Sequence, residues 1–364
     1  MMAQCIMRVA AGSRPRTPPG TMTDASVYNS SDNLNTHLNG VGRVLPSLRV
    51  SYESAALEQI LAGPEVLAVV GFGNAAPAHS DPRYLRVALE PLLGPAPFEV
   101  WRASAPVIHE TAGELRWSGD GDYAFGVIEV DEGARGGIAA SARYAYCLLR
   151  EWIAASRTPH VLRIWNYLDA INTGSGDSER YREFCRGRAD GMASLFEHGF
   201  PAATAIGVRS GRRVLQVYWL AARVRGAALE NPRQVSAWRY PREHGPSAPT
   251  FARAMRAPTR SPQLYISGTA AIVGHVSHHH DDLPAQLDET LMNFASLLEA
   301  AGVPAGAHFG SHSVLKGYVR NGADAGAVVA RLRERLPTST PMLLLHGDIC
   351  RRELLIEIDG ILAG

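Results

Sequence analysis

A carboxylate, Glu357, lies within an apolar stretch of the sequence, in DICRRELLIEIDG at 348–360. Residues 354–358 have the composition of a β-strand, and its alternation places Glu357 on the same face as Asp359. Burying an ionised carboxylate is costly unless the group is paired or its pKa rises. Two interpretations stand: a glutamate at the surface or paired with Arg351 or Arg352, or a general acid that apolar neighbours keep protonated near neutral pH.

Arginines next to aromatic residues form a second group of candidates. A guanidinium can hold a planar carboxylate with two parallel hydrogen bonds while neighbouring rings pack against the ligand. In RIWNY, Arg163 shares a strand face with two aromatic residues, and in SAWRYP, Arg239 is followed by Tyr240. Arg163 could equally be an interface arginine that the protein already satisfies.

The segment RYREFCRGRADGM predicts a helix with several arginines. Arg188 follows a glycine and precedes small residues, so we expect it to turn inward. Arg182 and Arg186 are expected on a solvated face.

Two motifs resemble known ligand sites but are interpreted otherwise. VVGFGNAA superficially matches a dinucleotide-binding turn, but Pro77 stands where the phosphate-binding helix should begin, so an ordinary tight turn is predicted. HVSHHHDD, 275–282, is rich in possible metal ligands, but adjacent histidines cannot all point to one centre. We predict a solvated loop there and no metal site.

The elements that position these residues fall into five segments. A polar extension, expected to be disordered, covers 1–44, and a small α/β section covers 45–105, with strands at 66–70 and 98–104 and a short helix near 84–93. Two β-α-β-α-β-β patterns follow, at 106–229 and 261–364, joined by a Pro- and Arg-rich segment at 230–260. RRVLQVYW aligns with RRELLIEI, so Tyr218 takes the place of Glu357 in the first copy.

Composition sets broad limits. The chain has 364 residues, 46% of them apolar, and a formal net charge of +1, which gives no general attraction to nucleic acid or to a membrane surface. Its four cysteines are scattered, without a CxxC pair, and no apolar run is long enough to span a membrane. We therefore expect a cytoplasmic protein without a signal peptide, with Met22 as its expected natural start.

Several motifs together resemble the chorismatase family. They are RIWNY, ERYREFCRGRA, ENPRQVSAWRYPREHGP, LYISGTAAIVGH, KGYVR and DICRRELLIEIDG, over roughly 100–360. The likeness is strongest to the hydroxybenzoate synthase branch, including the bifunctional enzymes of pigment biosynthesis. It implies an α+β fold of duplicated YjgF/RidA-like (chorismate-mutase-like) units, packed as a pseudo-trimer with the N-terminal α/β section.

The resemblance also implies roles for individual residues. Glu357 matches the family's catalytic glutamate, and Cys350 matches a cysteine of the branch that makes hydroxybenzoate. The substrate would be chorismate, with no cofactor, no metal, no nucleic acid and no membrane, and the protein would be a monomer or a small homo-oligomer. The expected substrate-binding residues are Arg163, Arg188, Tyr218, Arg239, Tyr240, Gly268, Ala270 and Ala271.

The implied reaction begins with protonation of chorismate's enol ether by Glu357, and an arene oxide then yields 3-hydroxybenzoate, with 4-hydroxybenzoate left open. Hydrolysis to a dihydrodiol, deamination of imines and non-catalytic binding of aromatic acids are the alternatives. Cys350 argues against hydrolysis, because the branch that hydrolyses chorismate lacks this cysteine.

Overall fold

The computed structural model describes residues 44–303 and 309–363, and these belong to one compact unit, Arg43–Gly364. The predicted polar extension lies outside the described residues except for its last position. No helix in the described part of the chain is long and apolar enough to cross a membrane.

The first repeat forms a sheet in which the strand that comes last in sequence lies between earlier ones. Its elements are β8 (Tyr123–Asp131), α2 (Glu132–Arg135), α3 (Ile138–Ala155), β9 (His160–Asp169), α4 (Arg180–Met192), β10 (Ala202–Val208) and β11 (Val214–Ala222). The strand order is β10-β9-β11-β8, extended by β7 (Leu115–Gly119) and β6 (Ile108–Ala112). β9 and β10 are parallel, and β11 is antiparallel to both of its neighbours.

The second repeat has the same topology. Its elements are β14 (Gln263–Thr269), α5 (Leu283–Ala300), β17 (Val314–Val319), α6 (Ala325–Arg335), β18 (Met342–His346) and β19 (Ile356–Ala363). The order β18-β17-β19-β14 repeats that of the first sheet, again with one parallel pair and an antiparallel central strand. The predicted duplication is therefore confirmed at the level of topology.

The N-terminal section is a third, abbreviated version of the same sheet. It contains β1 (Arg49–Glu53), α1 (Leu57–Leu61), β2 (Val66–Phe72), β3 (Tyr84–Val87) and β5 (Phe98–Arg102), in the order β3-β2-β5-β1. The predicted helix near 84–93 is wrong, because this stretch forms β3 and β4 (Glu90–Pro91). Pro91 of β4 would interrupt a helix over this stretch, and β3, with three of its four residues buried, pairs in parallel with β2 instead.

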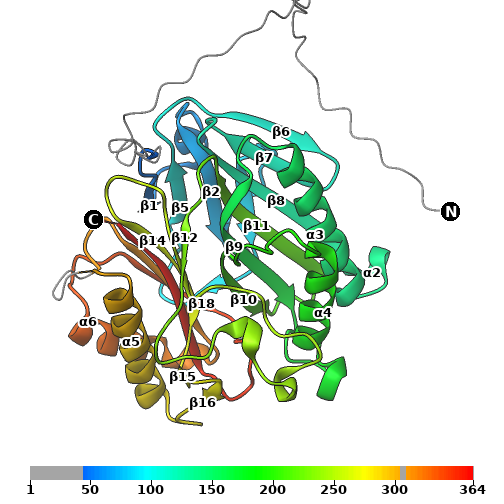
Figure 1. Ribbon diagram of the computed structural model, residues 1–364. Coiled ribbons are helices and arrows are strands. Elements are labelled where there is room, and N and C mark those ends of the chain that lie inside the picture. The colour runs from blue at the N-terminus through cyan, green and yellow to red at the C-terminus, as the bar shows by residue number, and fades with distance from the viewer. Residues whose placement is uncertain (1–43, 304–308, 364) are drawn as a thin grey trace, which may run out of the picture. The chain divides into compact units, whose positions relative to one another are not determined.

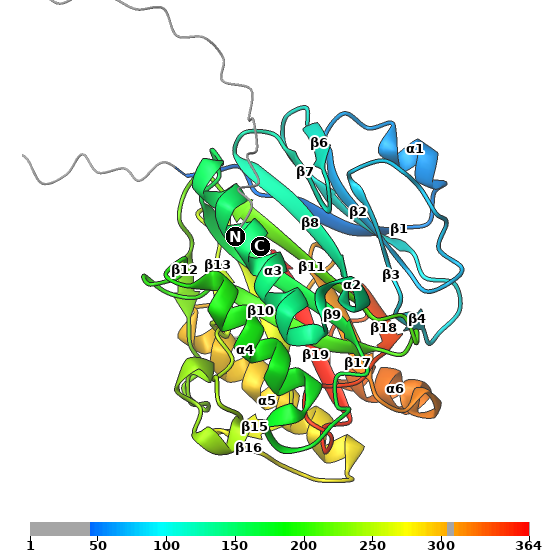
Figure 2. The ribbon, with the colours of Figure 1, turned by 90° about the vertical axis from the view of Figure 1, so that its right-hand side faces the viewer.

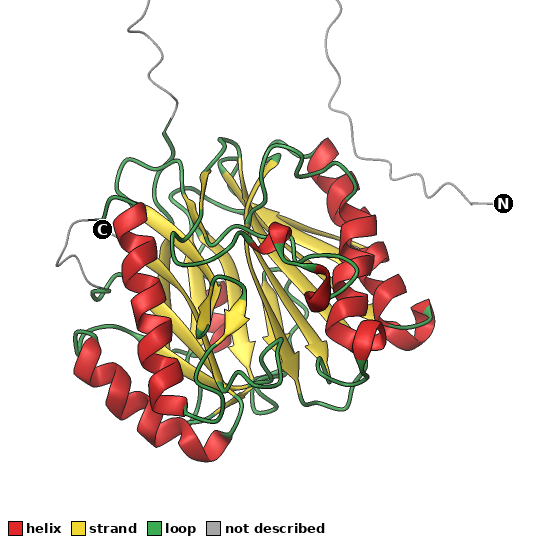
Figure 3. Cartoon of the chain, turned by 60° about the horizontal axis from the view of Figure 1, so that its bottom comes forward, coloured by secondary structure: helices red, strands yellow, loops and turns green. Residues whose placement is uncertain are grey.

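The three sheets share a core, and the long helices lie outside it. Figure 3 shows α3 and α4 on one side of the strands and α5 and α6 on the other, and Figures 1 and 2 show the same arrangement from two further directions. Trp101 of β5 lies 5.7 Å from Trp165 of β9 and 6.2 Å from Tyr265 of β14, measured between ring centroids. One aromatic residue from each sheet therefore meets in a single cluster.

The segment that joins the repeats passes over the sheets with little regular structure. It contains two short 3₁₀ turns and a short strand: η2 (Ala237–Arg239), η3 (Arg242–His244) and β13 (Ala254–Arg256). β12 (Ala227–Leu229) precedes it, and the hairpin β15 (Ile272–Val273) and β16 (Val276–Ser277) follows β14.

Two glycines let α3 and α4 pack in close contact. A Cβ at Gly187 would lie 2.0 Å from the carbonyl oxygen of Ala139, and one at Gly191 would lie 2.5 Å from that of Arg143. Because Gly187 faces α3, Arg188, which follows it, is directed to an adjacent side of α4 and is buried there.

We predict that Gly187→Ala lowers the free energy of unfolding by about 1–3 kcal/mol, because a backbone oxygen cannot move aside as a flexible side chain could. Urea denaturation measures this. The matched control is Gly326→Ala in α6, where a Cβ meets no atom within 4 Å; its stability should be unchanged or higher by up to about 1 kcal/mol. Equal losses in the two variants would contradict the packing argument.

Candidate active site

A cavity of about 220 Å³ is lined by β10 of the first repeat and by β14 and β19 of the second. Both repeats and the segment between them line it. The lining residues used below are Arg188, Thr204, Tyr240, Arg253, Gly268, Cys350, Arg351 and Glu357.

Glu357 reaches this cavity from the middle of a sheet, because β19 lies between β14 and β17. Its residue exposure is 6%, and no hydrogen bond or ion pair joins its carboxyl to another described residue. The surface and arginine-paired interpretations are therefore excluded for the described part of the chain. A Cβ at Gly268 would lie 1.9 Å from Glu357 Oε1, so a glycine at 268 leaves room for the carboxyl group.

Burial raises the pKa of Glu357 from 4.5 to about 8, and the negative charge of Asp359 adds to the effect. Arg163, Arg253 and Arg351 oppose the shift without cancelling it. At neutral pH the carboxyl group is therefore largely protonated, and it can act as an acid toward a molecule in the cavity.

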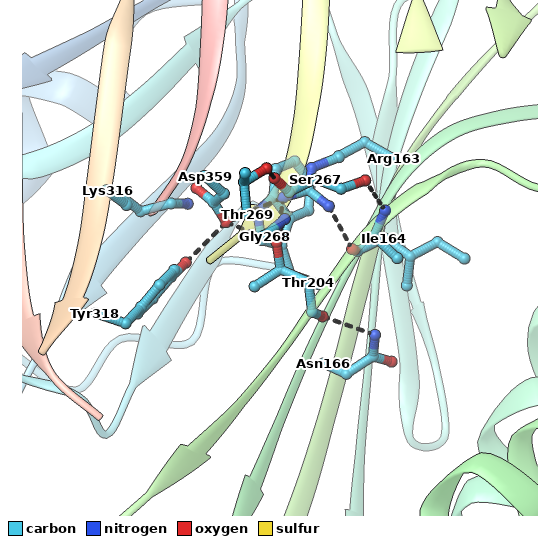
Figure 4. Close-up of polar contacts among 12 residues, drawn as sticks. Arg163, Ile164, Asn166, Thr204, Ser267, Gly268, Thr269, Lys316, Tyr318 and Asp359 are labelled. Carbon is cyan, nitrogen blue, oxygen red and sulfur yellow. Dashed lines mark hydrogen bonds and ion pairs between the residues drawn. The ribbon is translucent and has the colours of Figure 1, made fainter. Parts of the chain in front are cut away.

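Asp359 contributes its charge from a buried network behind the cavity (Figure 4). One oxygen, Oδ2, accepts hydrogen bonds from four side chains: Arg163 Nη2 at 3.0 Å, Trp165 Nε1 at 3.2 Å, Thr204 Oγ1 at 2.9 Å and Tyr318 Oη at 2.9 Å. Thr204 Oγ1 also accepts from the backbone N–H of Gly268 at 2.9 Å. Cavity wall and buried carboxylate are thus joined through one hydroxyl group.

Cys350 lies on a loop that Arg320 holds in place. The guanidinium of Arg320 donates to the carbonyl oxygens of Ile349, Arg351 and Leu354 at 3.0, 2.8 and 2.8 Å. Burial, and then the nearby Glu357, raise the pKa of the Cys350 thiol. The thiol is therefore protonated at neutral pH, which argues against a nucleophilic role.

Two arginines in the cavity wall have donors without a partner. Nε and Nη2 of Arg188 and Nε of Arg253 are buried and make no hydrogen bond to any described residue. Arg188 lies 5.2 Å from the ring centroid of Tyr146, and Arg253 Nη2 donates to Tyr240 Oη at 2.8 Å. Because leaving buried charged donors unsatisfied is costly, these groups suit an anionic ligand such as a carboxylate.

The structure gathers six of the ten predicted site residues around the cavity and places four elsewhere. Those that line it are Arg188, Tyr240, Gly268, Ala270, Cys350 and Glu357. Arg163 lies behind the wall in its ion pair with Asp359, which matches the alternative of an internally satisfied arginine. Tyr218 is buried in the central core, where its Oη lies 3.2 Å from Tyr167 Oη. Arg239 is exposed over the ring of Trp238, and Ala271 is fully buried beside the cavity.

Sequence reasoning missed several lining residues. Arg253 stands in the irregular segment before β14, where no periodicity indicated burial, and Arg351 was considered only as an ion-pair partner. Arg182, expected on a solvated face, also borders the cavity, whereas Arg186 is half exposed as predicted. Phe251, two residues before Arg253 and in contact with its guanidinium, was the available signal.

The other two motifs have the predicted local structure, except that Val276–Ser277 of the predicted loop form β16. Gly73 (φ +80°) lies in a turn after β2, with no helix following it. Residues 278–282 form a loop in which His280 is exposed. His275 lies apart from this run and is close to Glu243 and His244.

Fold and cavity together define an α+β protein of repeated sheet units, in which a buried carboxyl group and two arginines with unpartnered donors line one cavity. The family model described as "Chorismatase FkbO/Hyg5-like, N-terminal" matches residues 99–221. A chorismatase of Streptomyces rapamycinicus is 36% identical over 277 residues, which are 73% of this chain and 82% of that protein. A 3-hydroxybenzoate synthase of Streptomyces hygroscopicus is 36% identical over 277 residues, 72% of this chain and 80% of its own length.

A crystal structure of a chorismatase superimposes with a TM-score of 0.77 at 32% identity, covering 88% of this chain and 99% of that one. The chain belongs to the chorismatase family, whose named members are enzymes.

We predict that the stability difference between the wild type and Glu357→Gln depends on pH. With a pKa of about 8 when folded and 4.5 as the ordinary value, Glu357 holds a proton between these pH values that the unfolded chain releases. The wild type should therefore lose stability relative to the variant as pH rises through this window. Urea denaturation of both proteins from pH ~5 to ~9 measures it; a difference independent of pH would show that Glu357 titrates normally.

Proposed function

We propose that this protein converts chorismate to hydroxybenzoate and pyruvate, with 3-hydroxybenzoate as the main product. One observation carries the proposal: a protonated, unpaired carboxyl group and two arginines with unpartnered donors line the same cavity. The family membership supports this substrate, because the relatives that resemble the chain are named chorismatase and 3-hydroxybenzoate synthase.

The arginines would orient the substrate. Chorismate carries two carboxylates, one on the ring and one on the enolpyruvyl group. Arg188 and Arg253 offer the unpartnered N–H groups, and Arg351, which already donates to His275 O and Ser277 Oγ, adds positive charge to the same wall. Fixing both ends of a dianion places the enol ether in one position relative to Glu357.

Glu357 would supply the proton that starts the reaction. Its carboxyl proton goes to the methylene carbon of the enol ether, where the C=C π electrons form the new C–H bond and leave an oxocarbenium centre. The neighbouring hydroxyl oxygen of the substrate then attacks the ring carbon that bears the ether. The C–O bond breaks, pyruvate leaves, and the hydroxyl proton returns to the Glu357 carboxylate.

The arene oxide so formed opens and loses a ring proton to give the aromatic product. Chorismate is thus divided into hydroxybenzoate and pyruvate without added atoms or electrons, so the proposal includes no cofactor. Cys350, a protonated thiol in the wall, would shape the space around the oxide or assist its proton transfer and thereby influence which C–O bond opens.

We also propose that the protein works in the cytoplasm as a monomer or small homo-oligomer. The support for a monomer is that one chain supplies all three sheets of the shared core.

We predict that the purified protein, given chorismate alone, forms pyruvate and 3-hydroxybenzoate. Proton NMR spectra recorded during the reaction measure both products. Glu357→Gln keeps the size of the side chain but has no acidic proton, so kcat should fall by about 100-fold or more. Retained turnover in this variant would contradict the assigned role.

The product mixture separates the remaining alternatives. A 4-hydroxybenzoate signal would extend the proposal to a second product, and a dihydrodiol would replace it with hydrolysis. Cys350→Ala should change the product ratio while retaining pyruvate release. Unchanged chorismate together with activity on imines would support a deaminase, and ligand binding without turnover would support a binding protein.

A further inference from the structure

Two histidines and a glutamate bring their ligand atoms together at the border of the cavity. His244 Nε2 lies 3.1 Å from His275 Nδ1 and 3.4 Å from Glu243 Oε1, and His275 Nδ1 lies 3.3 Å from the same oxygen. Among the residues that the structure describes, this group alone gathers three potential ligands so closely.

The triangle has the dimensions of one face of a zinc coordination sphere. Zinc binds histidine nitrogen at about 2.0–2.1 Å and carboxylate oxygen at about 2.0–2.2 Å, so two ligands of a tetrahedral ion lie about 3.3–3.5 Å apart. The three separations of 3.1, 3.3 and 3.4 Å approach this value on every edge. Two imidazoles and a carboxylate are also a common zinc donor set, which leaves a fourth position for water.

The surroundings keep these ligands available but limit their affinity. The side chains of His244 and His275 are 20% and 33% exposed, so both rings are largely held in place while an ion can still reach them from solvent. Glu243 is 63% exposed and supplies the negative charge. Arg351 and Arg182 line the same cavity as His244, and their positive charges repel a cation and so favour reversible over permanent binding.

We propose that Glu243, His244 and His275 form a binding site for Zn²⁺ or a similar divalent cation at the border of the substrate cavity. The ion would join two segments that are far apart in sequence, η3 and the β15–β16 hairpin. Because His244 and Ile272 both line the cavity, a bound ion would hold this border together and slow the exchange of substrate. The ion takes no part in the proposed reaction.

Calorimetric titration of the full-length protein with ZnCl₂, without substrate, tests the site directly. We expect one ion per chain, and an intense visible spectrum typical of tetrahedral coordination when Co²⁺ is used instead. His275→Ala and Glu243→Gln should each lower the affinity for zinc by about 10–100-fold or more, because loss of groups that merely support metal ligands already costs that much. Both side chains are partly exposed, so these variants should fold normally.

The control is the double variant His278→Ala/His280→Ala, which removes two histidines of the neighbouring run but none of the three ligands. It should bind zinc as the wild type does. Loss of binding in the control but not in His275→Ala would overturn the proposal in favour of adventitious binding by the histidine run. Absence of both heat and a Co²⁺ spectrum would also overturn it.

The effect on turnover is a second readout. Zn²⁺ should slow pyruvate release from chorismate by the wild type and the double-variant control, and EDTA should reverse this. His275→Ala should be insensitive to zinc, and equal inhibition of His275→Ala would contradict the location of the site. This arm rests on the proposed function, whereas calorimetry tests the site even if chorismate is not the substrate.

Discussion

The buried carboxylate of Asp359 joins the sheet of the first repeat to that of the second, and much of the site depends on this junction. Its Oδ2 accepts hydrogen bonds from donors on β9, β10 and β17 while Asp359 itself belongs to β19. Removing one partner of a buried ion pair leaves an uncompensated charge, so a substitution of Asp359 or Arg163 alone would destabilise the folded protein. The cavity lies directly in front of this junction and is lined by β10, β14 and β19.

The same carboxylate separates the arginines of the site into two kinds. Arg163 is neutralised by Asp359 and therefore serves the junction, whereas Arg188 and Arg253 have no acidic partner among the described residues and retain free donors. The charge of Asp359 also makes ionisation of Glu357, two residues away on the same strand face, less favourable. One buried group thus supports both halves of the proposed chemistry: unpaired cations that hold an anion, and an acid that keeps its proton.

The sequence revealed site residues where a residue type conflicts with its neighbours in the chain. A carboxylate in an apolar strand marked Glu357, and a glycine before an arginine marked the inward turn of Arg188. The repeat pattern predicted the topology of the two large sheets. It did not reveal that the N-terminal section repeats the same strand order, because its second helix is absent and two short strands, β3 and β4, occupy the place where we expected a helix.

The sequence did not show which side chains pair with each other in the folded protein. The aromatic setting of Arg163 suggested ligand binding, but Asp359, far away in the chain, occupies its guanidinium. Arg253 and the group Glu243, His244 and His275 depend on how the irregular joining segment folds over the sheets, which no local pattern encodes.

The proposed reaction depends most on Glu357 being protonated at neutral pH in the folded protein. Infrared difference spectra between the wild type and Glu357→Gln, recorded as a function of pH, would follow the carboxyl C=O stretch of this residue directly. We expect a protonated carboxyl band that persists through neutral pH and disappears with a pKa of about 8. A band that is already lost near the ordinary value of 4.5 would show an ionised Glu357 and would contradict its role as the acid.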